Sequence, residues 1–258
     1  MANTDADSTA PAPDIGADDS FEDEGYAASF DTSYVSSIAS DIRNGVEENG
    51  RIYPAYGRGQ YGMPVDEEAQ HHNDINHAKF TLLMEDKLHL APIGPTPQGI
   101  LDIGTGSGIW AIDIADMYPS AHIVGTDIAA SQPQCLPPNC EFEIEDAEDD
   151  WVFPKVSFDY IHVRELLMSI RDWPKLIGQS YEHLKPGGWL ELGMTNPRTC
   201  CDDGSLDLKN SFYAESAKVF FELAEAMGTP LDASNAWKGM SCCLFCKIVS
   251  LVHLHRAS

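Results

Sequence analysis

The sequence predicts an α/β fold in which helices cover both faces of a parallel sheet. Short apolar segments alternate with helical segments over residues 99–240, and a glycine-rich loop joins the first apolar segment to the helix after it. The chain has 258 residues, of which 43% are hydrophobic, enough for one sizeable core and little more. These three observations favour a single α/β domain.

Composition divides the chain into four segments. Residues 1–30 are rich in Ala, Asp, Ser and Pro and poor in aliphatic side chains, so we expect a disordered acidic tail, with an interaction role as the alternative. Residues 31–98 are expected to form an N-terminal helical and aromatic cap segment. The α/β domain is expected over residues 99–240, followed by a C-terminal tail of atypical sequence at 241–258.

The cap segment contains a tyrosine cluster and one helix. Tyr53, Tyr56 and Tyr61 stand among glycines and arginines, which predicts an ordered loop from Asn49 to Tyr61, serving either as a structural anchor or as a lid. After Pro64, three consecutive acids suit the positive end of a helix. The apolar residues that we expect on the core side of this helix are Ile75, Phe80, Leu83 and Leu88.

Five strands and three further helices are expected in the α/β domain. The strands are predicted at residues 99–103, 122–126, 140–144, 158–163 and 189–192. The helices are predicted at residues 109–118, 173–184 and 212–227, and Gly228 can cap the last of them. Strands separated by helices pair in parallel, so both faces of the sheet should be covered.

The composition excludes several classes of partner. The formal net charge is -25, so the surface should repel phosphate backbones, and we expect no direct nucleic-acid binding. No apolar run is long enough to span a membrane, and no secretory signal begins the chain, which predicts a cytoplasmic or nuclear protein that is not secreted. Seven cysteines are expected as free thiols, and the lone C-x-x-C at Cys243–Cys246 does not predict a metal site.

The segment from Ile100 to Trp110 carries the strongest functional signal. It contains a strand, a tight turn and the start of a helix. Glycine lets the backbone turn sharply and approach a ligand, and the free N–H groups at a helix start bind polar or anionic groups. We therefore expect a ligand against the loop residues Gly104, Thr105, Gly106 and Gly108.

The glycine spacing distinguishes between two cofactors. A dinucleotide fingerprint needs glycine at position 109, where this chain has Ile109. The G-x-G-x-G loop resembles motif I of class I methyltransferases, a family with a seven-stranded Rossmann-like sheet. This resemblance implies S-adenosyl-L-methionine as the cofactor. It also implies that Asp102, just before the loop, helps to hold the methionine portion.

Two further acidic positions follow the second and third strands. Asp127 ends the second strand, 25 residues after Asp102, and can accept hydrogen bonds from both ribose hydroxyls, with Ile128 beside it. A helix cap is the alternative for Asp127. The family resemblance assigns Asp146 to the adenine amino group and the backbone of Ala147 to the ring. For the acid-rich stretch 145–150, a solvated loop is the alternative.

The resemblance extends to the fungal LaeA-type methyltransferases, over about residues 34–240. The segments that carry it are Arg51–Tyr56, Asp66–Gln70, Lys87–Pro92, Asp149–Trp151, Phe158–Arg164 and Lys185–Trp189. The family's name-giving members regulate fungal secondary metabolism in nuclear complexes, so the resemblance implies a link to secondary metabolism and a regulatory protein complex as a partner. It makes residues 99–240 a methyltransferase domain with a small molecule or a protein as the methyl acceptor.

The end of the fourth strand supplies candidates for the chemistry. Ligands of open α/β sheets gather at the carboxyl ends of the strands, where His162 and Arg164 lie. Methyl transfer needs alignment, and a base only when the acceptor must lose a proton. His162 is either that base or a packed strand histidine. Arg164 is expected to position a helix or a carboxylate.

The C-terminal residues depart from the family. Class I methyltransferases add two strands after the fifth, whereas residues 241–258 offer no turn signal and at most one strand. We expect a sheet that lacks one or both of these strands and a truncated or altered C-terminus. Two other functions remain open: a non-catalytic regulator that acts through protein partners, and, less favoured, an NAD(P)-dependent oxidoreductase.

Overall fold

The computed structural model describes residues 41–56, 61–195, 197, 201, 203–207, 210–229, 231, 237 and 248–250. The acidic tail expected at residues 1–30 lies outside the described residues, and so does most of the segment 241–258. Where the structure describes the chain, no helix is long and apolar enough to cross a bilayer.

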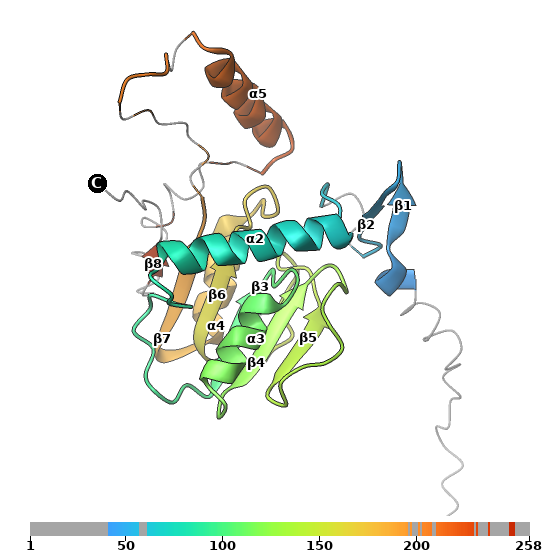
Figure 1. Ribbon diagram of the computed structural model, residues 1–258. Helices are drawn as coiled ribbons and strands as arrows, with labels where there is room; N and C mark the ends of the chain where they lie inside the picture. The colour runs from blue at the N-terminus through green and yellow to red at the C-terminus, as the bar shows by residue number, and fades with distance from the viewer. Residues whose placement is uncertain are drawn as a thin grey trace, which may run out of the picture.

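The centre of the molecule is one parallel sheet (Figure 1). In the described residues it has six strands, in the order β5-β4-β3-β6-β7-β8, and every neighbouring pair is parallel. The strands are β3 (Gly99–Ile103), β4 (His122–Asp127), β5 (Cys140–Ile144), β6 (Phe158–Arg164), β7 (Leu184–Gly193) and β8 (Ile248–Ser250). All five predicted strands are therefore present, and β8 is the single strand that the C-terminal segment could supply.

Helices pack on both faces of this sheet, as expected for the fold class. On one face, α3 (Ile109–Met117) buries Trp110 and Ile114 against alternate strand residues such as Ile100. On the other face, α4 (Trp173–His183) buries Leu176 against strand residues of the opposite parity, such as Leu101. Successive side chains of a strand point to opposite faces of the sheet, so they pack into two separate hydrophobic cores.

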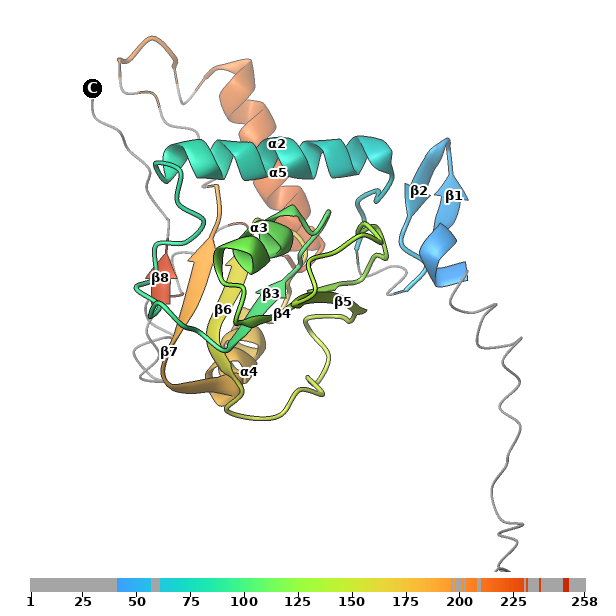
Figure 2. The same ribbon diagram turned by 60° about the horizontal axis from the view of Figure 1, so that its bottom comes forward.

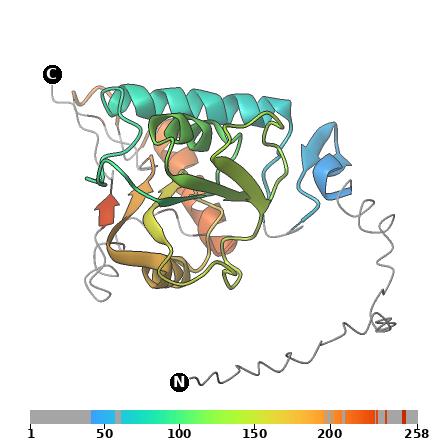
Figure 3. The same cartoon turned by 90° about the horizontal axis from the view of Figure 1, so that it is seen from below.

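The region predicted as a tyrosine-anchored loop contains a hairpin instead. Strands β1 (Val46–Glu48) and β2 (Arg51–Tyr53) pair antiparallel around Asn49 and Gly50. Both turn residues have positive φ, 52° and 77°, which is the geometry of a type I′ turn. The Asn-Gly pair is the usual signal for this turn, so the hairpin was predictable from the sequence. Figure 3 shows the hairpin beside the sheet, next to one end of the long helix α2.

Helix α2 (Glu67–Leu83) begins where the acidic residues predicted it. Asp66 caps it by accepting a hydrogen bond from the backbone N of Ala69 at 3.1 Å. The predicted core face of this helix is wrong, because Ile75 and Leu83 are 52% and 46% exposed and Leu88 lies beyond the end of the helix. Only Phe80 of that set is buried within α2, since the helix lies over the carboxyl edge of the sheet rather than on a face (Figure 2).

Helix α5 (Phe212–Ala226) is also confirmed, and Gly228 follows it with φ at 75°. Its apolar stripe does not pack on the sheet: Phe212 is 89% exposed, and Val219 and Leu223 are each more than half exposed. The helical period therefore predicted the element correctly but not the surface that it covers.

Candidate active site

A cavity of about 530 Å³ opens at the carboxyl ends of the strands. It lies where the strand order reverses, because the chain leaves β3 for β4 on one side and returns to β6 on the other. The predicted site residues that line it are Asp102, Gly104, Thr105, Gly106, Asp127, Ile128, Asp146, Ala147 and His162. The fold therefore gathers all the sequence-predicted residues except Gly108, which starts α3 behind the loop.

The glycine loop takes a conformation that requires its glycines. Gly104, Gly106 and Gly108 have φ of 69°, 60° and 80°. The backbone N–H groups of Gly104 and Thr105 donate to the carbonyl oxygen of Thr126 at 2.8 and 2.9 Å, which fastens the loop to the end of β4. The loop is thus held by backbone contacts and leaves its upper surface toward the cavity.

Phe142 of β5 explains why Gly108 cannot be replaced by a residue with a side chain. A Cβ at Gly108 would stand 2.4 Å from the Phe142 ring, and a Cβ at Gly125 would stand 2.7 Å from it. The aromatic ring fills the space under the loop, so the two glycines and Phe142 form one packing unit. Gly108 packs beneath the loop and does not line the cavity, and its cofactor-binding role stays a prediction.

Asp102 and His162 form a buried pair beneath the loop. The Nδ1 atom of His162 lies 2.7 Å from one carboxylate oxygen of Asp102, and the Thr105 hydroxyl donates to the other at 2.6 Å. The His162 ring stacks on Trp110 with a centroid separation of 3.7 Å and is 3% exposed. Asp102 therefore holds the loop and the histidine in place. The catalytic role of His162 stays a prediction.

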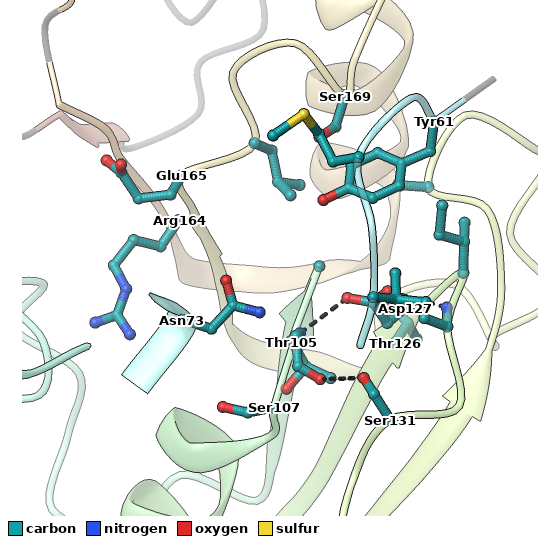
Figure 4. A pocket seen from close by; sticks show the side chains of 18 of the residues that line it. Tyr61, Asn73, Thr105, Ser107, Thr126, Asp127, Ser131, Arg164, Glu165 and Ser169 are labelled. Atoms are coloured by element: carbon teal, nitrogen blue, oxygen red, sulfur yellow. Dashed lines mark hydrogen bonds between the residues drawn. The ribbon is translucent and has the colours of Figure 1, made fainter. Parts of the chain in front are cut away.

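Asp127 is tied to the loop from the side of β4. Its carboxylate accepts hydrogen bonds from the backbone N of Gly106 at 2.8 Å and of Ala129 at 3.0 Å. Burial raises the pKa of Asp127 to about 6, although these backbone contacts oppose the shift. Tyr61 faces the same carboxylate, and burial together with the Asp127 charge raises the pKa of Tyr61 to about 12. Figure 4 shows both side chains on one side of the cavity.

Neighbouring acidic residues in the loop after β5 make different contacts. Glu148 accepts hydrogen bonds from the backbone N of Arg171 and of Asp172, both at 2.7 Å, so it anchors the loop before α4. Asp146 accepts a hydrogen bond from the Glu148 backbone at 2.9 Å, and Ala147 lines the cavity beside it. Burial raises the pKa of Glu145 in the same wall. The adenine roles of Asp146 and Ala147 stay predictions.

Helix α2 forms the roof of the cavity, which the sequence interpretation missed. Gln70, Asn73 and Asn76 line the cavity from this helix. A Cβ at Gly106 would stand 2.9 Å from the Asn73 amide nitrogen, so the helix lies directly over the loop. The Ser107 hydroxyl donates to Asp74 at 2.8 Å. The sequence signal that could have revealed this roof is the helical spacing of the three amide side chains, which places them on one polar face of the helix.

Arg164 joins the roof to the end of β6. Its guanidinium donates to Nδ1 of His77 at 3.0 Å and lies over the Phe80 ring at 5.1 Å. Nε2 of His77 lies 3.0 Å from the Asp113 carboxylate. Burial and the Arg164 charge lower the pKa of His77, so the ring is neutral, donates to Asp113 and accepts from Arg164. The expectation that Arg164 positions a helix matches these contacts with α2.

Nothing in the described part of the chain groups three or more His, Cys, Asp or Glu side chains as a metal site. The predicted C-x-x-C segment, Cys243–Cys246, lies outside the described residues. Cys135, Cys140 and Cys201 are free thiols.

The sequence matches a known family over most of the α/β domain. The profile of the family described as "Methyltransferase domain" covers residues 75–232. The chain belongs to this family. The predicted fold class is confirmed, and the domain is a member of the methyltransferase family, as the resemblance predicted. The family match contradicts the alternative of an NAD(P)-dependent oxidoreductase.

Curated fungal relatives extend the similarity. The chain is 40% identical over 208 residues to the Methyltransferase pytC of Aspergillus terreus, which covers 80% of this chain and 64% of the relative. It is 42% identical over 164 residues to the Secondary metabolism regulator LAE1 of Cochliobolus heterostrophus, covering 62% of this chain and 53% of that protein. A third relative is the Protein-methionine methyltransferase laeA of Emericella nidulans, 42% identical over 163 residues and covering 62% of this chain and 43% of the relative. The chain thus spans about two fifths to two thirds of the length of these relatives. The predicted resemblance to LaeA-type proteins is confirmed.

Proposed function

We propose that this chain binds S-adenosyl-L-methionine in the cavity under α2 and transfers its methyl group to an acceptor. The observation that carries the proposal is the glycine loop fastened to Asp127 at the point where the strand order reverses. The cavity wall is rich in carboxylates, at Asp102, Asp127 and Asp146 among others. Such a wall suits a cofactor that carries a sulfonium cation and ribose hydroxyls.

The proposed contacts follow from the donor and acceptor groups that each wall offers. Asp127 accepts the ribose hydroxyls in addition to the loop N–H group that it already holds. Asp146 and the backbone of Ala147 take the adenine, with Ile128 against the ring. Gly104, Thr105 and Gly106 line the cavity where the chain of the ligand would lie, and Gly108 packs behind the loop. Asn73 and Tyr61 cover the ligand from the other side.

The cofactor supplies an electrophilic methyl group, so the residues of this chain chiefly align the acceptor and exclude water. A base is needed only for an acceptor that carries a proton, and we propose His162 for that role. Its Nδ1 atom is held by Asp102, which leaves Nε2 as the ring nitrogen that could accept a proton. An acceptor such as a thioether would need no base.

The acceptor is a protein or a small molecule. One relative is named a protein-methionine methyltransferase, which supports a protein acceptor, and others are named regulators of secondary metabolism, which supports a link to that process and a regulatory complex. The acidic composition supports the absence of direct nucleic-acid binding. We place the protein in the cytoplasm or the nucleus, without membrane association.

Calorimetric titration tests the cofactor proposal. S-adenosylhomocysteine should bind and raise the melting temperature, whereas NAD should do neither. Asp127→Ala removes the acceptor for two hydroxyls, so the affinity for S-adenosylhomocysteine should fall roughly 10- to 100-fold. Asp150→Ala is the matched control, because Asp150 is a 94% exposed acid outside the cavity wall. A melting-temperature shift with NAD alone would contradict the proposal.

The second candidate is a regulator that keeps the fold and works through protein partners. The exposed apolar stripe of α5, led by Phe212 and Leu223, favours it. A methyl-transfer assay separates the two, because a regulator that keeps the fold can bind the cofactor without transferring its methyl group.

A further inference from the structure

Arg164 is one of three arginines in a cavity lining that also contains six acidic residues. It lines the cavity together with Asp102, Asp127 and Glu165. The cavity's other two arginines each face a carboxylate: Arg51 lies 2.6 Å from Asp66, and Arg171 lies 3.4 Å from Glu148. Arg164 has no carboxylate oxygen within 4.0 Å in the part of the chain that the structure describes. A largely buried guanidinium without a carboxylate is costly, and an incoming anion would offset that cost.

The position of Arg164 puts this charge at one end of the cavity. Residue 164 follows Val163, which pairs with Ile103, so Arg164 stands level with the first loop glycine, Gly104. Figure 4 shows Arg164 and Glu165 on the opposite side of the cavity from Asp127, with Asn73, Thr105 and Ser107 between them. A ligand with its ribose at Asp127 and its chain along the loop would end at Arg164.

The contacts of Arg164 hold its guanidinium without neutralising it. His77 accepts one of its N–H groups at 3.0 Å, and the Phe80 ring covers its face. His77 is in turn held by Asp113 at 3.0 Å. One nitrogen is therefore used by a neutral ring, while the other N–H groups of the guanidinium have no hydrogen-bond partner among the residues that the structure describes. Paired guanidinium N–H groups match the geometry of a carboxylate.

We infer that Arg164 is the binding residue for the carboxylate of the methionine portion of the cofactor, held in position by His77 of the roof helix. This inference rests on the proposed function. The methionine portion carries one carboxylate at the end opposite to the adenosine, which is the only anionic group of the cofactor. The negative charges of Asp102 and Glu165 in the same wall favour an ammonium group nearby. The site therefore complements both the carboxylate and the ammonium group of the methionine portion.

The test compares two ligands on the same protein. S-adenosylhomocysteine and its decarboxylated form differ only in the carboxylate. On the unaltered chain, the decarboxylated form should bind at least about tenfold more weakly, in the range of a charge-assisted hydrogen bond. Arg164→Gln should weaken S-adenosylhomocysteine about 10- to 100-fold and leave the affinity for the decarboxylated form within about twofold. Titration calorimetry measures all four affinities.

Asp127→Ala is the matched control, because both ligands contain the ribose, and it should weaken both by the same factor. Arg164→Lys keeps the charge and should restore part of the preference for the carboxylate, which keeps the test usable if Arg164→Gln folds poorly. Equal losses for the two ligands, or no loss of S-adenosylhomocysteine affinity, would overturn the inference. If neither ligand binds the unaltered chain, the proposed function itself fails, which is a different result.

Discussion

At the scale of single residues, the candidate site depends on carboxylates that differ in their surroundings. Asp102 is buried, and both its oxygens are used by Thr105 and His162. Asp127 lies in the same wall and keeps acceptor capacity beyond its two backbone contacts. The two acids, 25 positions apart, therefore differ in role: Asp102 holds the loop and His162, whereas we propose that Asp127 accepts the ribose hydroxyls.

The raised pKa of Asp127 predicts how cofactor affinity depends on pH. Only the carboxylate accepts two hydroxyl hydrogen bonds, and burial raises its pKa to about 6 in the free chain. The affinity for S-adenosylhomocysteine should therefore fall up to tenfold for each pH unit below 6 and level off above about pH 7. Calorimetry between pH 5 and 8 measures this, and Asp127→Asn should remove the dependence.

The stability of the free chain should respond to this group with the opposite sign. A raised pKa means that the folded state binds the proton more tightly than the unfolded state does. The Asp127 contribution to the free energy of unfolding therefore falls as pH rises from about 4 through 6. For the affinity prediction, an affinity for S-adenosylhomocysteine that does not change across pH 6 in the unaltered chain would contradict the proposed contact between Asp127 and the ribose.

At the scale of elements, α2 is a roof held mainly by polar contacts. Asp66 caps the helix and pairs with Arg51, while Lys79 near the other end donates to Thr195 at 2.8 Å. Phe80 and His77 are its only buried side chains in the structure as described. A helix with so little buried apolar area depends on each of these contacts, and it covers the cavity directly.

Two apolar residues of α2 should respond very differently to truncation. Phe80 is 2% exposed and contacts Met84 and Arg164, so Phe80→Ala should cost about 3–5 kcal/mol of unfolding free energy. Ile75 is 52% exposed, so Ile75→Ala should change stability by less than about 0.5 kcal/mol. Urea unfolding followed by circular dichroism compares them. Comparable losses would mean that the helix buries its Ile75 face.

At the scale of the whole molecule, acidic residues far outnumber basic ones. The net charge is -25, and the first 30 residues contribute eight acids and no base. Like charges repel over roughly 10 Å at 0.1 M salt, so part of this repulsion acts on the folded domain only at low ionic strength. The composition of the tail gives it little to pack against the domain.

Removing residues 1–30 should leave cofactor affinity within about twofold and the melting temperature unchanged at physiological salt. The deletion changes the net charge from -25 to -17, so the gain in melting temperature between low and high salt should become smaller. Thermal unfolding at two salt concentrations checks this. A large loss of stability at physiological salt would show that the tail docks on the domain.

The sequence by itself determined the features that depend on local order. The strand, loop and helix from Gly99 to Met117 follow from an apolar run, glycines at fixed spacing and a helical period. The position of Asp127 at the end of β4 follows in the same way, because the carboxyl ends of parallel strands meet at one edge. These signals lie within a few residues of one another, so they can be recognised without knowing what surrounds them.

Only the tertiary structure decided which surfaces meet. The helical period identified α2 and α5, yet it assigned Ile75 and Leu83 of α2 to a core side that the fold leaves exposed. The contact of Arg164 with His77 joins residues 87 positions apart, and Phe142 lies under Gly108 from a different strand. Such contacts depend on the order of strands in the sheet and on where a helix crosses its edge. Periodicity reports which side of an element is apolar, whereas packing between distant segments determines what that side, and the polar side opposite, will touch.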